Sequence, residues 1–587
     1  MQPAWKPLGI GLNLIDWEHY RMNVTPAIPL RIGLTTLALL LASCGGGGGG
    51  DNSTSVPAGP PPSRADTQRF LEQAAFGPTD ADVAAVQSQG FSGWISNQFV
   101  TPSSGYPGYF YVVGNGGGGC QTDPNVVAHA ANNLMLQNCG RDYYGVFQVQ
   151  RQFFANAQSG KDQLRQRVAF ALSQIIVTSG YEAYAQADYQ QMLLDNAFGN
   201  FRDLLTKFTL HPTMGDWLDM VNNDKPNPAK GIQANENYAR ELLQLFTIGL
   251  SKLNLDGSVQ TDANGKPIPT YGQTEVTSLA RAFTGWTYPP VAGAASKWTN
   301  PLNHAGQMVQ FDAHHDTNAK TLLDGQVLPA GQNAQQDLNG ALDIIFNHPN
   351  VGPFVGKQLI QKLVTGSPSP AYVQRVAAVF NNNGKGVRGD MQAVVRAILL
   401  DSEARGDSKT AAGYGRLREP ALYLAGFLRS MGATTDGVYT RGISQNLGQG
   451  VYASPSVFNF YPPSYLVPGT TITGPEFSIL DTSSALGRMN FISQIVFRGG
   501  ANADASVANA IGTHLDLTGY ASVTDAGTLT DQIADRLLHG QLPAGARTAI
   551  VNAVTALTPA SIKSDPALPA KTVAYLIATS PLYQVER

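Results

Sequence analysis

The feature that most constrains the fold is the spacing of apolar residues in the body of the chain, which follows the period of an α-helix. In 164–177 the apolar side chains recur every three or four positions, so they line one face of a helix. Such a face has to be buried against other elements. The apolar positions of this segment are Leu164, Val168, Ala171, Leu172, Ile175 and Ile176.

The same pattern recurs along the chain and predicts a mainly α fold. The chain has 587 residues, 43% of them hydrophobic, which is enough to bury a sizeable core. Further helices are predicted at 67–76, 80–87, 187–198, 235–246, 274–283, 337–346, 351–364, 371–381, 390–400, 419–431, 529–538, 546–557 and 570–579.

Two stretches depart from the helical pattern. The turn pairs Asp256-Gly257 and Asn264-Gly265 predict a small β-hairpin within 253–271. The second stretch, 451–475, is rich in proline, glycine and aromatic residues and predicts a long loop. No clear linker interrupts 64–587, so we expect one large multi-helix domain there, with a boundary near 402–414 as the alternative.

The N-terminal part has the pattern of an export signal. Arg31 precedes an apolar segment, 32–43, that is shorter than the ~20 residues a membrane-spanning helix needs. The segment ends in Leu41-Ala42-Ser43-Cys44, which resembles a bacterial lipobox, in which the cysteine is lipidated. We therefore predict a signal peptide at 1–43 and a lipid on Cys44, with an ordinary secretory peptide as the alternative.

The residues around this motif refine the prediction. Six glycines and a stretch rich in Ser, Pro and Gly follow Cys44, so 44–63 is expected to be a flexible tether to a membrane. Gly45, rather than an aspartate, favours the outer membrane over the inner one. Asp16 and Glu18 do not fit the positively charged start of a signal peptide, which favours Met22 as the true start.

Two other cysteines, Cys120 and Cys139, remain for the exported body. In an oxidising compartment two leftover cysteines most simply form a disulfide. Two free thiols are the alternative, because spacing alone does not settle pairing.

Charge and missing motifs exclude several functions. Charged residues make up 14% of the chain and the net charge is −3, without the basic clusters that nucleic-acid binding needs. The sequence has no H-E-x-x-H, G-x-S-x-G, Walker A or paired C-x-x-C motif. Common zinc proteases, α/β-hydrolases and P-loop enzymes are therefore disfavoured.

The first candidate site is the charged segment that begins at Asn235. Glu236 and Arg240 are four residues apart and share a helix face, with Glu241 beside them. One interpretation is a surface ion pair of little energy. The other is a polar cluster that Arg281 from the next predicted helix completes, with Glu236 or Glu241 as catalytic carboxylates and Arg240 and Arg281 as binding groups.

The second candidate site lies around two adjacent histidines. His315 and Asp316 could bind a divalent metal or act as an acid–base pair, and Lys320 follows as a binding residue. Neighbouring side chains point apart, so a metal would need further ligands such as His304, Glu236 or Glu241. The alternative is that His315 locks a loop through hydrogen bonds.

The third candidate is the aromatic and proline-rich segment Phe458-Asn459-Phe460-Tyr461-Pro462-Pro463. Phe458 and Tyr461 could stack on a sugar or anchor a partner protein. Packing of a long loop onto the core is the favoured alternative.

Several long motifs identify a resemblance that covers most of 64–587. The chain resembles the bacterial DUF1800 family, whose molecular function is not established. The resemblance implies an exported, mainly helical protein, and a co-exported protein similar to sulfatases as a partner. The motifs are Arg69–Thr79, Leu164–Leu172, Asn235–Gly249, Ala280–Trp286, His315-Asp316, Pro455–Tyr461 and Thr579–Tyr583.

Two functions remain open. We favour a lipoprotein whose helical body is a scaffold for a partner protein or a polymer, because no motif demands chemistry. The alternative is an envelope or extracellular hydrolase. It would use Glu236 or Glu241 as base and His315 with Asp316 as acid or metal ligands.

Overall fold

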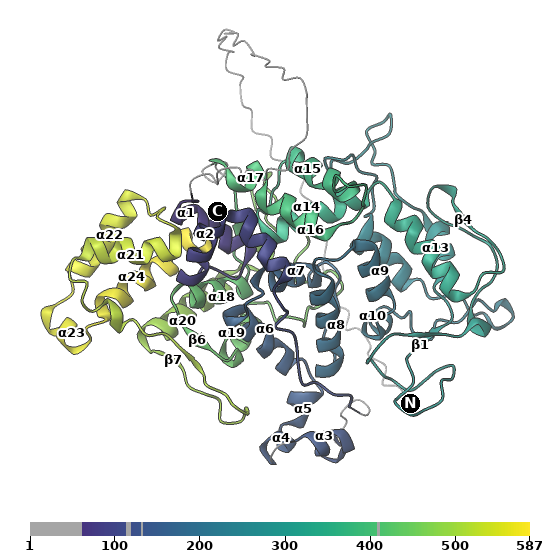
Figure 1. The fold of residues 1–587 in the computed structure, drawn as a ribbon, viewed down its shortest axis with the longest axis horizontal. Coiled ribbons are helices and arrows are strands. Elements are labelled where there is room, and N and C mark those ends of the chain that lie inside the picture. The colour runs from purple at the N-terminus through teal and green to yellow at the C-terminus, as the bar shows by residue number, and fades with distance from the viewer. Residues whose placement is uncertain (1–60, 113–118, 131–132, 408–410, 412) are drawn as a thin grey trace, which may run out of the picture. The chain divides into compact units, whose positions relative to one another are not determined.

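The computed structural model describes residues 61–112, 119–130, 133–407, 411 and 413–587. The predicted signal peptide, Cys44 and nearly all of the tether lie outside the described residues. Gly59–Arg587 forms one compact unit. The fold is mainly α, as the sequence predicts (Figure 1). The strands of the described residues are each two residues long.

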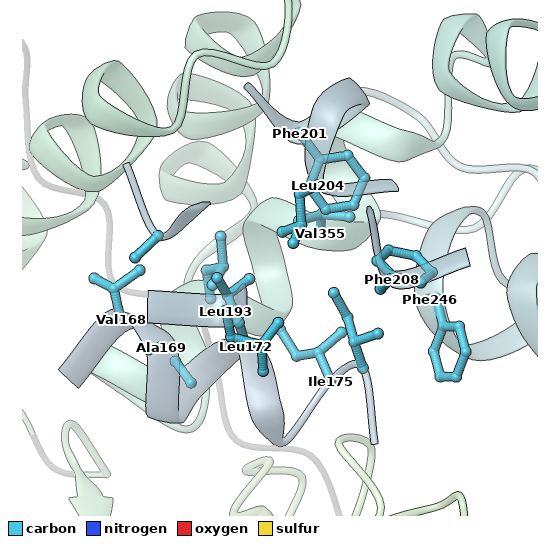
Figure 2. Packing of buried hydrophobic residues seen from close by; sticks show 14 of the residues in the cluster. Val168, Ala169, Leu172, Ile175, Leu193, Phe201, Leu204, Phe208, Phe246 and Val355 are labelled. Atoms are coloured by element: carbon cyan, nitrogen blue, oxygen red, sulfur yellow. The ribbon is translucent and has the colours of Figure 1, made fainter. Parts of the chain in front are cut away.

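The larger of two hydrophobic cores is built by helices from the first two thirds of the chain. Leu164, Val168 and Leu172 are fully buried, so the periodic face of α7 is the buried face that the sequence predicts. Figure 2 shows Val168 and Leu172 with residues of neighbouring helices, among them Leu193, Phe201 and Val355. The helices are α1 (Arg64–Ala74), α2 (Asp80–Val100), α6 (Phe147–Ser159), α7 (Gln163–Ser173), α8 (Ala183–Asn196), α9 (Phe201–Thr209), α10 (Pro212–Trp217), α11 (Asn237–Glu241), α12 (Gln273–Ala282), α13 (Ala334–Asn347), α14 (Val351–Leu363), α15 (Pro370–Asn381), α16 (Met391–Leu400) and α17 (Ser402–Arg405).

The second core is formed by the C-terminal helices. Helix α18 belongs to both cores, because Leu422 and Ala425 lie in the first and Phe427 and Leu428 in the second. The helices of this part are α18 (Pro420–Ser430), α19 (Val438–Asn446), α20 (Thr482–Phe497), α21 (Ala526–Leu538), α22 (Ala544–Thr555), α23 (Pro559–Ser564), α24 (Leu568–Ala578) and α25 (Pro581–Gln584).

The sheets are small and antiparallel. Strand β5 (Arg416–Leu417) pairs with β9 (Val585–Glu586), which joins the C-terminus to the middle of the chain. The other pairs are β1 (Trp286–Thr287) with β2 (Val309–Gln310), and β3 (Lys320–Thr321) with β4 (Val327–Leu328). A three-stranded sheet has the order β6 (Thr434–Thr435), β8 (Thr513–His514), β7 (Gly500–Ala501).

The segment predicted as a hairpin folds back on itself without forming regular strands. Isolated antiparallel bridges join Ser251 to Pro269, Leu253 to Val259 and Thr261 to Pro267. Both predicted turns are present, with Gly257 and Gly265 at a φ of 77°. Glycine reaches this left-handed conformation without steric cost.

A small lobe contains the two remaining cysteines. Cys120 and Cys139 form a disulfide, with 5.9 Å between their Cα atoms, as expected from the sequence. Three short helices surround it and pack against Tyr184. They are α3 (Pro124–His129), α4 (Asn133–Gln137) and α5 (Cys139–Tyr143). No helix of the described part is both long and apolar enough to cross a membrane.

Candidate functional site

Glu236 and Arg240 form the predicted ion pair at the start of α11. Arg240 Nη2 lies 2.9 Å from Glu236 Oε2, and both side chains are partly exposed. Gln273 and Thr277 of α12 also donate hydrogen bonds to the Glu236 carboxylate. Partial burial alone raises the pKa of Glu236, but these hydrogen bonds and the charge of Arg240 outweigh it and lower the pKa. This geometry is that of a surface ion pair.

Glu241 and Arg281 do not join that pair. Glu241 is 8% exposed, burial raises its pKa, and its Oε2 atom has no hydrogen-bond partner within the described ranges. Arg281 instead contacts Asp316, with 2.6 Å between Nε and Oδ2. Burial raises the pKa of Asp316, yet the hydrogen bonds from Arg281 and Asn318 lower it to about 2.

His315 is buried and has both ring nitrogens engaged. Its Nε2 lies 2.8 Å from Asp337 Oδ2, and its Nδ1 lies 2.9 Å from the carbonyl oxygen of Thr284. Lys320 Nζ reaches the same Asp337 oxygen at 2.6 Å. This arrangement matches the loop-locking alternative, in which hydrogen bonds fix the segment that carries His315.

The predicted acid–base and metal residues thus make three sets of side-chain contacts. These are Glu236 with Arg240, Arg281 with Asp316, and His315 with Asp337 and Lys320. The last two sets are joined, because Lys320 Nζ also donates to the carbonyl oxygen of Asp316. Across the described residues, no group of three or more His, Cys, Asp and Glu side chains has the geometry to hold a metal ion. The enzymatic use of Glu236, Glu241, His315 and Asp316 stays a prediction.

The structure instead brings two other predicted residues to a cavity of about 330 Å³. Phe458 lies at its mouth with 54% of its surface exposed, whereas Tyr461 is buried and lines its inner end. The cavity is bounded by the segment after α7, a helical segment after α11, α14 and the loop 457–464. Its apolar lining consists of Ile175, Leu245, Ile248, Leu250, Leu253, Phe354, Val457, Phe458, Pro462 and Pro463.

A π-helix shapes one wall of this cavity. The sequence predicts an α-helix over 235–246, but α11 ends at Glu241 and the π-helix η3 (Leu242–Thr247) follows. Gly249, with a φ of 71°, donates its N–H to the carbonyl oxygen of Leu243 and ends the helix. The wider turn places Gln244 and Leu245 on the cavity wall. Single π-turns of this kind are frequent at functional sites.

The inner end of the cavity, here called the floor, is polar. Lys362 Nζ lies 3.1 Å from Gln174 Oε1 and 4.0 Å from the centre of the Tyr461 ring. The Tyr461 hydroxyl lies 2.8 Å from the same Gln174 oxygen and 2.6 Å from Glu419 Oε2. Asn459, which adopts a left-handed φ of 64°, also donates to Gln174. Hydrogen bonds among Gln174, Asn459, Tyr461 and Glu419 therefore fix the polar groups around Lys362.

Burial shifts the titration of the charged groups at this floor. Desolvation lowers the pKa of Lys362 to about 8, against the opposing charge of Glu419. Desolvation raises the pKa of Glu476, and neither of its carboxylate oxygens has a hydrogen-bond partner among the described residues. For Glu419, desolvation is outweighed by the charges of Arg416 and Lys362, so its pKa is lowered. Of these groups Lys362 lines the cavity, whereas Glu419 and Glu476 do not. A buried lysine with a lowered pKa at a cavity marks a candidate functional site.

Sequence reasoning missed Lys362 and Gln174. Lys362 lies in a predicted helix among Leu359, Ile360 and Leu363, which are all fully buried. A single lysine on the apolar face of such a helix is a usable signal, because an isolated buried charge is costly. Gln174 carries no comparable signal, since its role depends on where α7 ends.

Comparison with known proteins places the chain in a family. The family model described as a protein of unknown function (DUF1800) matches residues 69–585. A comparison with curated proteins gives no match. A comparison with solved structures gives no match either. The matched range contains every residue of the cavity and nearly the whole helical body, so the chain belongs to the DUF1800 family.

Proposed function

We propose that this chain is an exported, lipid-anchored binding protein whose cavity between η3, α14 and the loop 457–464 holds a ligand with an apolar part. The lipobox-like sequence before Cys44 and the glycine-rich tether support the anchor. The scaffold for a partner protein or a polymer that the sequence predicts stays a prediction, and the cavity instead supports a small ligand. The co-exported sulfatase-like partner stays a prediction.

The observation that carries the proposal is the composition of the cavity. Its volume of about 330 Å³ and its largely apolar wall with a few convergent polar groups are typical of sites for small ligands. Leu250 and Phe458, exposed to 59% and 54%, stand at its wall and mouth. Exposed apolar side chains beside a hollow are characteristic of binding surfaces.

A specific observation also favours catalysis as a second candidate. Lys362, with a pKa of about 8, lies beside the Tyr461–Glu419 hydrogen bond, and the pKa of Glu476 is raised. A buried lysine whose pKa is lowered toward neutrality can exchange a proton with a substrate. The hydrolase alternative would therefore act at this floor rather than at Glu236 and His315.

Binding is tested with a neutral apolar fluorescent probe, N-phenyl-1-naphthylamine, and the compact unit Gly59–Arg587. Phe458→Ala removes the aromatic ring at the mouth and should weaken probe binding about tenfold. The matched control is Phe497→Ala, which removes an aromatic side chain exposed to 40% that does not line the cavity. Ser251→Trp should block the cavity. Equal binding by the wild type and all three variants would contradict the proposal.

The anchor is tested separately by mass spectrometry of the membrane-extracted protein. We expect an N-terminal Cys44 that carries lipid, because the residues before it match the pattern that lipoprotein processing recognises. A Cys44→Ala variant, which cannot be lipidated, should lose membrane association. An unmodified chain that begins at Met1 or Met22 would refute the anchor and leave the cavity proposal standing.

A further inference from the structure

The Lys362 ammonium has unused hydrogen-bond donors at the floor of the cavity. The residue is 5% exposed, and an ammonium group carries three N–H donors. Within the described residues the side chain has one hydrogen-bond acceptor, Gln174 Oε1. The ring of Tyr461 covers another side of the group. A buried cation with donors left over is costly unless a further acceptor arrives.

A second unused donor lies one helical turn away. Gln358 precedes Lys362 by four residues on α14, so the two side chains share one face of the helix. Both line the cavity, and Gln358 Nε2 is buried without a hydrogen-bond partner in the part of the chain that the structure describes. Two neighbouring donors of this kind fit the two oxygens of one planar acceptor group.

The surrounding charges favour an acceptor that carries a single negative charge. Behind Lys362, Arg416 lies 3.3 Å from both Glu419 and Glu586, so its guanidinium is already paired. Arg167 adds a further buried cation. Glu419 and Glu586 are thus both paired with Arg416, so the Lys362 ammonium is left to be matched by one further negative charge.

We propose that the cavity recognises an amphiphilic monocarboxylate, whose carboxylate binds Lys362 and Gln358 and whose apolar chain lies along Ile175, Leu245 and Phe354. This inference rests on the proposed binding function and names its ligand class. The short apolar wall suits a chain of modest length. Burial of each methylene group adds to the affinity.

The test compares octanoate with 1-octanol by isothermal titration calorimetry on Gly59–Arg587. The two probes share an apolar chain and differ in the charge of the head group. We expect octanoate to bind the wild type more tightly. Lys362→Met should weaken octanoate about 10- to 100-fold, the loss typical of a charge-assisted hydrogen bond, and leave octanol unchanged. Gln358→Leu should weaken octanoate less.

Two controls keep the result specific. Lys357→Met removes a lysine of the same helix that does not line the cavity, so it should leave both affinities unchanged. Thermal unfolding checks that each variant is folded. If Lys362→Met does not fold, Gln358→Leu and the pH series decide.

The pH series uses the wild type alone. Lys362 is faced by Glu419, Glu476, Arg416 and Arg167, and its pKa of about 8 means that it loses its proton above that pH. Octanoate affinity should therefore fall as pH rises above about 8, whereas octanol affinity should stay constant.

The outcomes separate this inference from the proposed function. Equal binding of octanol and octanoate, both blocked by Ser251→Trp, would overturn the carboxylate inference and leave the apolar cavity intact. Binding of neither probe, together with no binding of N-phenyl-1-naphthylamine, would overturn both.

Discussion

At the scale of single residues, His304 shows how the fold favours the protonated form of a buried side chain outside the cavity. It is fully buried, with Nδ1 3.5 Å from Glu182 Oε2 and Nε2 3.4 Å from Asp216 Oδ2. Burial lowers the pKa of His304, but the two carboxylates together raise it above its ordinary value. Tyr288 also donates to Asp216 and fixes that carboxylate.

Glu182 and Asp216 thus clamp His304 from two sides, and this clamp predicts a free energy of unfolding that depends on pH. A raised folded-state pKa means that the protonated His304 stabilises the fold fully below pH ~6.5, and that this contribution is lost as pH rises through the folded pKa. His304→Asn should therefore cost about 1–3 kcal/mol at acidic pH and less at alkaline pH. Urea unfolding at several pH values measures the difference. The control is the exposed His514→Asn, and a cost independent of pH would contradict the clamp.

The sequence predicts residues of the candidate site only where the residue type, or its cluster with similar neighbours, is itself unusual. Phe458 and Tyr461 stand in an aromatic cluster, and both line the cavity. The sequence predicts a joint role for His315 and Asp316 because they are neighbours. Their side chains point apart, however: His315 contacts Asp337, and Asp316 contacts Arg281. Which carboxylate a histidine meets depends on residues distant in the sequence, and no local pattern encodes that.

At the scale of elements, periodicity located helices better than it located their ends. The predicted helix 351–364 nearly coincides with α14 (Val351–Leu363). The predicted 80–87 continues as α2 to Val100, because the chain resumes its helix beyond a kink at Gly90. Helices α6, α9, α19 and α20 are among those that the periodicity does not predict. In α6, buried polar side chains such as Gln150 and Asn156 interrupt the apolar pattern.

The π-helix η3 was not predictable from the same pattern. Its residues Leu242, Leu243 and Phe246 are buried at spacings that also fit an α-helix. Gly249, which ends this helix, packs so closely against Phe354 that a Cβ atom there would lie 2.7 Å from the ring. The cavity wall thus depends on tertiary packing that propensity does not report.

At the scale of the whole described unit, one helix links the two hydrophobic cores. All residues of α18 are buried, with Leu422 and Ala425 in the first core and Phe427 and Leu428 in the second. Pairing of β5 with β9 adds a second link, because it holds the C-terminus against the strand that precedes α18. A substitution that destabilises either core should therefore destabilise the other core as well.

We accordingly expect Gly59–Arg587 to unfold in a single transition. Phe427→Ala empties a fully buried site of the second core and should cost about 3–5 kcal/mol. All four tryptophans of this unit precede residue 300 and none belongs to the second core, so tryptophan fluorescence reports unfolding of the first. Far-UV circular dichroism reports the helices of both. If α18 couples the cores, Phe427→Ala lowers both midpoints equally, because neither core keeps its packing once the shared helix is released. A fluorescence midpoint that stays in place while part of the dichroism is lost earlier would instead establish two independent cores.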